Sequence, residues 1–350
     1  MTRTAAAAAA VLIACAASQV RTDACTTFCA KSGDGVIFGR NYDFEIGDGA
    51  LFVNTRGLEK HGFARNGPTW VATYGSVTFN QFGRDFPTGG MNEKGLVVEL
   101  MWLDGTVYPR VDDRAELGVL EWIQYQLDTS ATVADVVRSD ANVRIAGPAP
   151  LHYLIGDPSG AAATVEFLGG RLVAHTGDRL PVAVLANSTY DESLRYWRQK
   201  GESSLPGGSR SEARFARAAS QIRSIGSLSS AQAVDRAFAI LGDVAQTSTR
   251  WTIVYQQTAR VVHFRTDENR DVKRVSLDAL EMSCRAPVRV VDLHRRVSGD
   301  ITAQLEPYTA AANEALVKRN YAASSVTRRT PAAEVQAVAA HPETSTCKKR

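Results

Sequence analysis

The sequence predicts an α+β fold in which β-sheets are packed between layers of helices. Short runs rich in valine, isoleucine, threonine and aromatic residues, bounded by Gly, Pro, Asn and Asp, indicate strands along most of the chain. Helical patterns occur in pairs between groups of strands, and they do not follow each strand in turn. This order favours sheets enclosed by helix layers over alternating βαβ units.

The predicted strands share β-branched or aromatic residues and turn-forming flanks. They cover residues 36–38, 51–54, 70–74, 96–101, 151–155, 163–167, 182–186, 251–256 and 260–265. Between two of them, Pro158 fixes the backbone of a turn and Gly160 closes it. The strands on either side of this turn are therefore expected to form a hairpin.

The predicted helices are marked by apolar residues that recur every three or four positions. They cover residues 115–128, 132–138, 214–225 and 231–241. In the first of them, Leu117, Leu120, Ile123 and Leu127 would share one face and pack against a sheet.

The N-terminal segment, residues 1–24, is interpreted as a secretory signal peptide. Arg3 supplies a positive start, an apolar run covers residues 5–17, and small and polar residues continue to Ala24. Cleavage after Ala24 would place the mature protein in the periplasm or outside the cell. A lipoprotein remains the alternative, because the residues that end at Cys15 resemble a processing site that would put a lipid on that cysteine.

The remaining sequence is expected to form one domain over residues 25–300 and a tail over residues 301–350. The tail is rich in alanine, with a helix predicted over 308–320, and we expect its polar, basic end from Ser324 to be mobile. No membrane span is predicted, because no later stretch has the roughly 18 apolar residues that one requires. The net charge of +3 is too small to indicate nucleic-acid binding.

Export would leave four cysteines, Cys25, Cys29, Cys284 and Cys347, in a compartment where disulfides form. Their spacing does not determine how they pair. We expect Cys284 to pair with Cys347, since this bond would hold the tail, and a disulfide between Cys25 and Cys29 is the structural alternative for Cys25. The cysteines and the scattered histidines have no metal-site spacing, so neither a metal nor an organic cofactor is implied.

Cys25 is the candidate nucleophile. The chain contains no GxSxG elbow, P-loop, HExxH or GxGxxG before a helix, and its histidines offer no obvious partner for a thiol. An N-terminal cysteine needs no such partner, because its own α-amine has a pKa of about 8 and acts as a base close to neutral pH. Cleavage before Cys25 would therefore supply nucleophile and base in one residue.

Five ordered motifs resemble the choloylglycine hydrolase family of linear amide hydrolases, which includes bile salt hydrolases and penicillin V acylases. The motifs lie at residues 24–28 together with 38–44, and at 90–96, 150–160, 185–188 and 212–215. The resemblance covers residues 25–280 and is strongest to the Gram-negative penicillin V acylase branch. It implies an N-terminal-nucleophile hydrolase of four αββα layers, with two packed antiparallel sheets between the helix layers.

The resemblance also implies roles for five residues. Cys25 would attack an amide carbonyl and form a thioester, Arg40 would favour the thiolate, and Asp43 would hold the α-amine. Asn187 would donate to the oxyanion, and Arg214 would be the second arginine of the site. Each of the last four residues also has a structural interpretation: a surface arginine at a strand end, a turn-forming Asp or Asn, or a solvated arginine at a helix start.

Trp102 departs from the family pattern, because bile salt hydrolases have asparagine and other penicillin V acylases tyrosine at its position. Its ring would either line a pocket for an apolar acyl group or belong to the core. This difference puts steroid specificity in doubt. The segment between Asn187 and Arg214 is shorter than in many Gram-positive members, where it helps tetramer assembly, so a homo-oligomer is left open.

The sequence therefore predicts an exported amidase for a small-molecule amide. Penicillin V, an N-acyl homoserine lactone and a conjugated bile salt are the candidate substrates. Two alternatives remain: a ceramidase-like lipid amidase or acyltransferase on the same fold, and a non-catalytic exported binding protein. Signal peptidase and autoproteolysis would expose the same Cys25, so the sequence does not choose between them.

Overall fold

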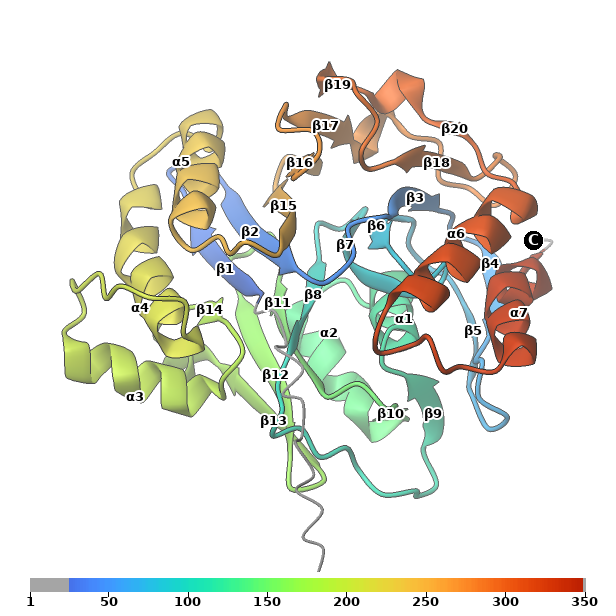
Figure 1. Cartoon of the computed structure of the whole chain (residues 1–350), viewed down its shortest axis with the longest axis horizontal. Helices are drawn as coiled ribbons and strands as arrows, with labels where there is room; N and C mark the ends of the chain where they lie inside the picture. Colours follow the sequence, from blue (N-terminus) through green and yellow to red (C-terminus); the bar gives the residue numbers. More distant parts are fainter. Residues whose placement is uncertain (1–24, 349–350) are drawn as a thin grey trace, which may run out of the picture.

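The computed structural model describes residues 25–348, so the predicted signal peptide and Cys15 lie outside the described residues. Two large sheets pack against each other and are enclosed by helices (Figure 1). All neighbouring strands in the two sheets are antiparallel apart from one short pair at an edge. The predicted α+β fold with four αββα layers is confirmed.

The first sheet has seven strands in the order β14-β1-β2-β15-β16-β17-β19 and presents Cys25 at the start of β1. Its central strands, β1, β2 and β15, are buried along almost their whole length. In chain order the strands are β1 (Thr26–Lys31), β2 (Val36–Asp43), β14 (Val184–Leu185), β15 (Thr249–Gln256), β16 (Val261–Thr266), β17 (Lys273–Ser276) and β19 (Gly299–Asp300).

The second sheet has nine strands in the order β13-β12-β11-β8-β7-β6-β3-β18-β20. The predicted hairpin around Pro158 and Gly160 is confirmed, because β11 and β12 pair across that turn. The strands are β3 (Ala50–Asn54), β6 (Ser76–Asn80), β7 (Pro87–Asn92), β8 (Val97–Trp102), β11 (Leu151–Gly156), β12 (Ala162–Leu168), β13 (Arg171–Thr176), β18 (Arg289–Asp292) and β20 (Glu306–Pro307).

Helices cover the outer face of each sheet. Helices α4 (Ser211–Ile222) and α5 (Ser230–Asp243) pack on the first sheet, and α3 (Tyr190–Lys200) packs against α4. Helices α1 (Glu121–Thr129) and α2 (Val133–Arg138) pack on the second sheet. Across residues 25–348, no helix has the length and hydropathy needed to cross a membrane.

The main core lies where the two sheets face each other. Phe38 and Tyr255 from the first sheet meet Phe79 from the second, with ring centroids 6.1 Å apart for Phe38 and Tyr255 and 6.2 Å apart for Phe79 and Tyr255. On the opposite face of β2, Gly39 makes room for the ring of its partner Phe28, because a Cβ atom on Gly39 would lie 2.5 Å from that ring. Such close packing leaves each inward side chain a single well-defined position.

The prediction of one helix over 115–128 is wrong at its start. Residues Ala115–Gly118 form β9, which pairs in parallel with β10 (Val143–Ala146), and α1 begins only at Glu121. The apolar residue Leu117 is buried in this small sheet and does not lie on the face of a helix. The pairing joins segments distant in sequence, and these tertiary contacts outweigh the local helical pattern.

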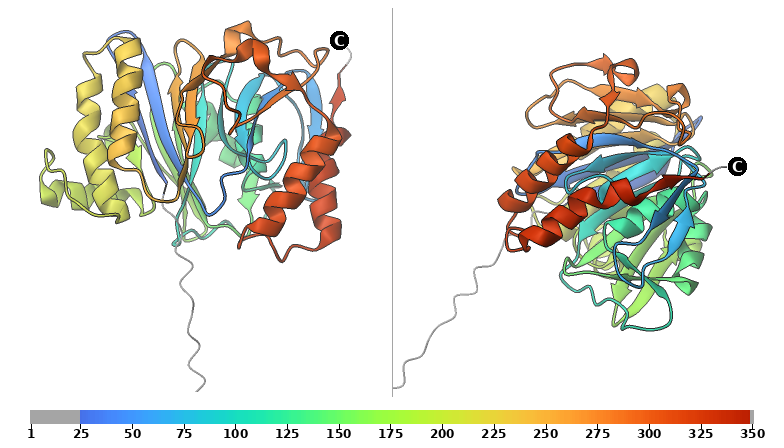
Figure 2. Two further views of the ribbon diagram at one scale, coloured as in Figure 1. Left: turned by 45° about the horizontal axis from the view of Figure 1, so that its top comes forward. Right: turned by 90° about the vertical axis from the view of Figure 1, so that its right-hand side faces the viewer.

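The C-terminal residues pack against the edge of the second sheet. Helices α6 (Ala310–Ala323) and α7 (Ala332–Ala340) lie side by side there (Figure 2). We expected a mobile end from Ser324, whereas the structure has α7 and then β21 (Thr346–Cys347), which pairs with β4 (Leu58–His61). β4 also pairs with β5 (Thr69–Val71). The predicted disulfide between Cys284 and Cys347 is confirmed.

Candidate active site

Cys25 lies immediately before β1 and lines a large cavity. Its side chain is buried, and the backbone N–H of Asp43 donates to its sulfur over 3.5 Å. Cys25 and Cys29 are separate free thiols, so the alternative of a disulfide between them is wrong. The sulfur of Cys25 is therefore available for chemistry at the cavity wall.

Arg40 joins the two sheets beside Cys25. It extends from β2 and forms an ion pair with Glu99 of β8, and both side chains are fully buried. Its other contacts are with main-chain carbonyls: Nη1 donates to Thr88 over 2.8 Å and Nη2 to Leu100 over 3.2 Å. Burial at this position excludes the interpretation of Arg40 as a surface residue.

The charges around Cys25 act in opposite directions on its pKa. Burial raises the pKa of the Cys25 thiol, and the positive charge of Arg40 is the largest influence that lowers it. Burial raises the pKa of Glu99 to about 7, although Arg40 and a hydrogen bond from the Tyr255 hydroxyl oppose this change. Burial disfavours the charge on Arg40, yet Glu99 raises the pKa of Arg40, so the guanidinium stays charged.

Arg214 connects three parts of the site. From α4 it donates to the main-chain carbonyl of Cys25 over 2.7 Å, to the side-chain oxygen of Asn187 over 3.0 Å and to the hydroxyl of Thr26. Burial lowers the pKa of Arg214, and the charges of Asp43 and Cys25 oppose that change. Arg214 is fully buried, so the interpretation of it as a solvated arginine at a helix start is wrong. Its hydrogen bonds hold Cys25 and Asn187 in place.

Asn187 and Trp102 are joined by a hydrogen bond near Cys25. The side-chain amide of Asn187 donates to the main-chain carbonyl of Trp102 over 2.8 Å, and its backbone N–H donates to the hydroxyl of Ser211 over 2.8 Å. Trp102 is half-buried, and its indole N–H donates to Asp104 over 2.6 Å. Asn187 is thus held by α4 and β8, which belong to different layers.

Asp43 ends β2 and is 1% exposed. The hydroxyl of Thr249 donates to its carboxylate, while its backbone contacts the sulfur of Cys25. All six residues singled out in the sequence are therefore brought together, although they come from strands β2 and β8, helix α4, the loop that contains Asn187 and the position before β1. Within residues 25–348, no group of His, Cys, Asp and Glu is placed to hold a metal.

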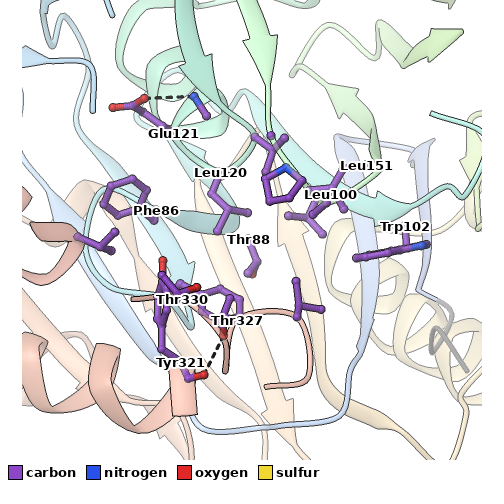
Figure 3. A pocket seen from close by; sticks show the side chains of 18 of the residues that line it. Phe86, Thr88, Leu100, Trp102, Leu120, Glu121, Leu151, Tyr321, Thr327 and Thr330 are labelled. Carbon is purple, nitrogen blue, oxygen red and sulfur yellow. Dashed lines mark hydrogen bonds between the residues drawn. The ribbon is translucent and has the colours of Figure 1, made fainter. Parts of the chain in front are cut away.

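The cavity has a volume of about 780 Å³ and a mostly apolar lining. Cys25, Asp43 and Trp102 line it, Arg40 and Arg214 support the site from within the protein, and Asn187 is partly exposed beside them. Trp102 lies on one side of the cavity, and Phe86 and Tyr321 lie on the other (Figure 3). The volume lies within the range of pockets that bury a small ligand.

Sequence reasoning missed Glu99, which supports Arg40. The available signal was a single acidic residue inside the apolar run 96–101, since a buried acid in such a run needs a cationic partner. Sequence reasoning also missed the cavity residues after position 300, such as Tyr321 and Thr330. No local pattern marks these residues, because they reach the site only through tertiary packing.

The motif around residues 90–96 shapes the hairpin that carries Glu99. A Cβ atom on Gly89 would lie 1.8 Å from the carboxylate of Glu99, so β7 must have glycine opposite that acid. The side-chain oxygen of Asn92 accepts from the backbone N–H groups of Lys94 over 3.0 Å and Leu96 over 3.1 Å. This motif therefore acts through strand geometry, and its side chains do not line the cavity.

Sequence comparisons identify relatives of this chain. The family model described as "Linear amide C-N hydrolases, choloylglycine hydrolase family" matches residues 25–290. A penicillin V acylase of Pectobacterium atrosepticum is 34% identical over 181 residues, which cover 45% of this chain and 47% of that protein. The chain thus matches about half the length of that curated relative.

Structural comparisons give the same fold. A penicillin V acylase from Agrobacterium tumefaciens has a TM-score of 0.73 and 30% identity, and the match covers 81% of this chain and 98% of that one. A variant of a conjugated bile acid hydrolase from Clostridium perfringens has a TM-score of 0.67 and 18% identity, over 78% of this chain and 98% of that one. The second likeness bears on the fold alone.

Glu99→Gln tests the ion pair between the sheets. The change leaves the Arg40 cation buried without its counter-charge, so we expect the free energy of unfolding to fall by about 3 kcal/mol or more. Urea denaturation at pH 8 measures this difference. At that pH most of the native protein has Glu99 ionised, because its pKa is about 7.

Glu93→Gln is the matched control. It removes the same charge from a partly exposed ion pair with Arg56, 3.0 Å long, and we expect a loss below about 1 kcal/mol. Equal losses in the two variants would show that Glu99 contributes no more than a surface acid.

Proposed function

Because the chain belongs to the choloylglycine hydrolase family of linear amide C–N hydrolases, we propose that it cleaves the amide of an N-acylated small molecule, with Cys25 as nucleophile. One observation carries this proposal above the others. Cys25 is a free thiol on the wall of an apolar cavity, and Arg40, Asp43, Asn187 and Arg214 surround it. In this arrangement an acyl group fills the cavity and its carbonyl carbon meets the sulfur.

The first substrate to test is penicillin V. Two of the similar proteins are penicillin V acylases, and the apolar lining suits an aromatic or aliphatic acyl group. N-acyl homoserine lactones and conjugated bile salts are the other candidates. The volume and the apolar lining of the cavity favour a lipid amidase on the same fold as the second candidate function.

In the acylation step the sulfur of Cys25 bonds to the amide carbonyl carbon, and the thiol proton passes to the free α-amine of the same residue. That amine exists only once the chain begins at Cys25. The positive charge of Arg40 lowers the cost of thiolate formation, which burial raises. The buried carboxylate of Asp43 favours the protonated amine that results.

The carbonyl oxygen becomes an oxyanion as the sulfur bond forms. The amide nitrogen of Asn187 has two hydrogens: one binds the carbonyl of Trp102, and the other is proposed to donate to the oxyanion. When the carbonyl re-forms, the C–N bond breaks and the α-ammonium gives its proton to the leaving amine. Water then attacks the thioester, the acid is released, and the thiol is restored.

We propose that the protein acts after export, in the periplasm or outside the cell. The apolar N-terminal run supports this location, and so does the disulfide between Cys284 and Cys347, because disulfides persist in oxidising compartments. Removal of residues 1–24 during export would also generate the α-amine that the mechanism requires. Export and activation are thus proposed to be one event.

Cys25→Ala tests the nucleophile. Without the thiol no thioester forms, so we expect hydrolysis of penicillin V to fall by about 10³-fold or more. Product release is followed with the purified chain beginning at residue 25. Cys29→Ala is the control, because Cys29 is a buried free thiol that faces Gln257, and we expect its activity to stay within a few-fold of wild type. Hydrolysis retained by Cys25→Ala would refute the mechanism.

Asn187→Ala tests the oxyanion donor. Loss of one such donor typically lowers kcat by about 10²- to 10³-fold, so we expect that decrease with little change in KM. Steady-state kinetics on penicillin V separate the two constants. The neighbouring Ser188→Ala is the control, and we expect it to keep the wild-type kcat. A change confined to KM would assign Asn187 to substrate binding.

N-terminal sequencing tests the activation step. We expect protein recovered from an exporting host to begin at Cys25, because the base of the mechanism is the α-amine of that residue. Intact-mass analysis of the same sample also detects a lipid on Cys15. Full activity in a chain that begins upstream of Cys25 would contradict the role of the α-amine.

A further inference from the structure

We propose that the C-terminal hairpin selects the acyl group by forming the wall of the cavity farthest from Trp102. The C-terminal hairpin is defined as α6, α7 and the linker 324–331 between them. It lies beyond residues 25–290, which the family model matches. The proposal rests on the proposed amidase function and specifies which acyl groups it accepts.

Residues from the hairpin line the same cavity as Cys25. Tyr321 at the end of α6, Val326 and Thr330 in the linker, and Val338 of α7 all face this space. Figure 3 shows Tyr321 and Thr330 across the cavity from Trp102. An acyl group that extends from the sulfur of Cys25 through the cavity therefore ends against the C-terminal hairpin.

The wall on which the hairpin rests is aromatic. Phe82 meets Tyr321 edge to face, with ring centroids 5.7 Å apart, and Phe44 meets Phe82 in the same way at 6.3 Å. Phe44 directly follows Asp43, so this row of rings begins at the catalytic cluster and ends at the C-terminal hairpin. Rings in such a row offer a continuous surface to methylene groups.

Buried amide side chains fix the position of α6. Asn313 accepts from the backbone N–H of Arg84 over 2.9 Å and donates to the carbonyl of Ala339 in α7 over 2.9 Å. Asn320 donates to the carbonyls of Gln81 over 2.7 Å and Asp48 over 3.0 Å. These bonds hold both helices against the second sheet.

The C-terminal hairpin is also held at two further points, one at the end of α6 and one beyond α7. At the end of α6, the hydroxyl of Ser324 donates over 2.6 Å to Glu45, which lies two residues after Asp43. Beyond α7, the disulfide from Cys347 to Cys284 and the pairing of β21 with β4 hold the chain. A wall fixed in this way limits the length of the acyl group that it admits.

The carboxylates that line this end of the cavity, those of Glu121 and Glu334, disfavour a negatively charged acyl group, and most of the remaining lining is apolar. The carboxylate of Glu121 is already used by the backbone N–H groups of Phe63, over 2.7 Å, and Gly118, over 3.3 Å. The neighbouring surfaces come from Phe86, Leu120 and Val338. The class of substrate that we infer is therefore an amide with a flexible aliphatic acyl chain long enough to reach the C-terminal hairpin.

Thr330→Phe tests the inference by filling the cavity at its far wall. The 4-nitroanilides of decanoic and butanoic acid serve as long and short substrates with one leaving group. Each buried methylene contributes about fourfold to binding, so displacement of a few methylenes predicts a fall of about tenfold or more in the decanoyl-to-butanoyl ratio of kcat/KM. We expect this fall to come from a higher KM for the decanoyl substrate.

Ala333→Phe is the matched control, because it adds the same ring at an exposed position of α7 that does not line the cavity. We expect Ala333→Phe to leave the ratio unchanged.

Tyr321→Ala is the second test variant. It removes a ring from the far wall and lengthens the cavity, so we expect kcat/KM for a tetradecanoyl anilide to rise relative to the decanoyl one. An unchanged ratio in both Thr330→Phe and Tyr321→Ala would overturn the proposal, as would equal effects of Thr330→Phe and Ala333→Phe.

Calorimetric binding of decanoate to the Cys25→Ala chain separates this inference from the amidase function, since it requires no hydrolysis. We expect Thr330→Phe in that background to weaken decanoate binding by about tenfold or more, and Ala333→Phe to have no effect. If decanoate binding shows this pattern but the wild type hydrolyses no substrate, the proposed amidase function is wrong and the role of the C-terminal hairpin in acyl binding stands. Hydrolysis by wild type, with decanoate binding absent or insensitive to Thr330→Phe, would reject the wall alone.

Discussion

The buried ion pair of Arg40 and Glu99 connects the two sheets at the point where Cys25 begins β1. Two charges taken out of water cost several kcal/mol each, and that cost is offset only where geometry and hydrogen bonds are good. Carbonyl groups of Thr88 and Leu100 complete the bonding of Arg40, and the hydroxyl of Tyr255 adds a bond to Glu99. The relative position of the sheets is therefore specified by polar contacts as well as by apolar packing.

A second polar chain connects the outer helix layer to the same place. Arg214 of α4 holds the carbonyl of Cys25 and the side chain of Asn187, and Asn187 in turn binds the carbonyl of Trp102 in β8. Cys25, the proposed nucleophile, is thus held by groups from two sheets and a helix before any substrate arrives. Such support keeps a catalytic group within the narrow range of positions that a reaction tolerates.

Sequence patterns predicted the layers and six residues of the site, because strand composition, turn residues and ordered motifs are local features. The errors arise where distant segments pair. Residues 115–118 were predicted to be helical but form a strand that pairs with β10. The end of the chain was predicted to be mobile but contains α7 and is held by the disulfide to Cys284. Glu99 was visible only as an acid in an apolar run, whose partner Arg40 lies 59 positions away. No local pattern contains that information.

The fold separates the proposed reaction centre from the proposed determinant of the acyl group. The groups around Cys25 lie between the sheets, whereas the C-terminal hairpin lies at the edge of the second sheet and meets the catalytic segment through the contact of Ser324 with Glu45. Side chains in the linker can therefore change in size while Arg40 and Glu99 keep their partners. In the proposed function, a disulfide-held extension that lines an apolar cavity allows the acyl specificity to vary while the buried polar centre stays the same.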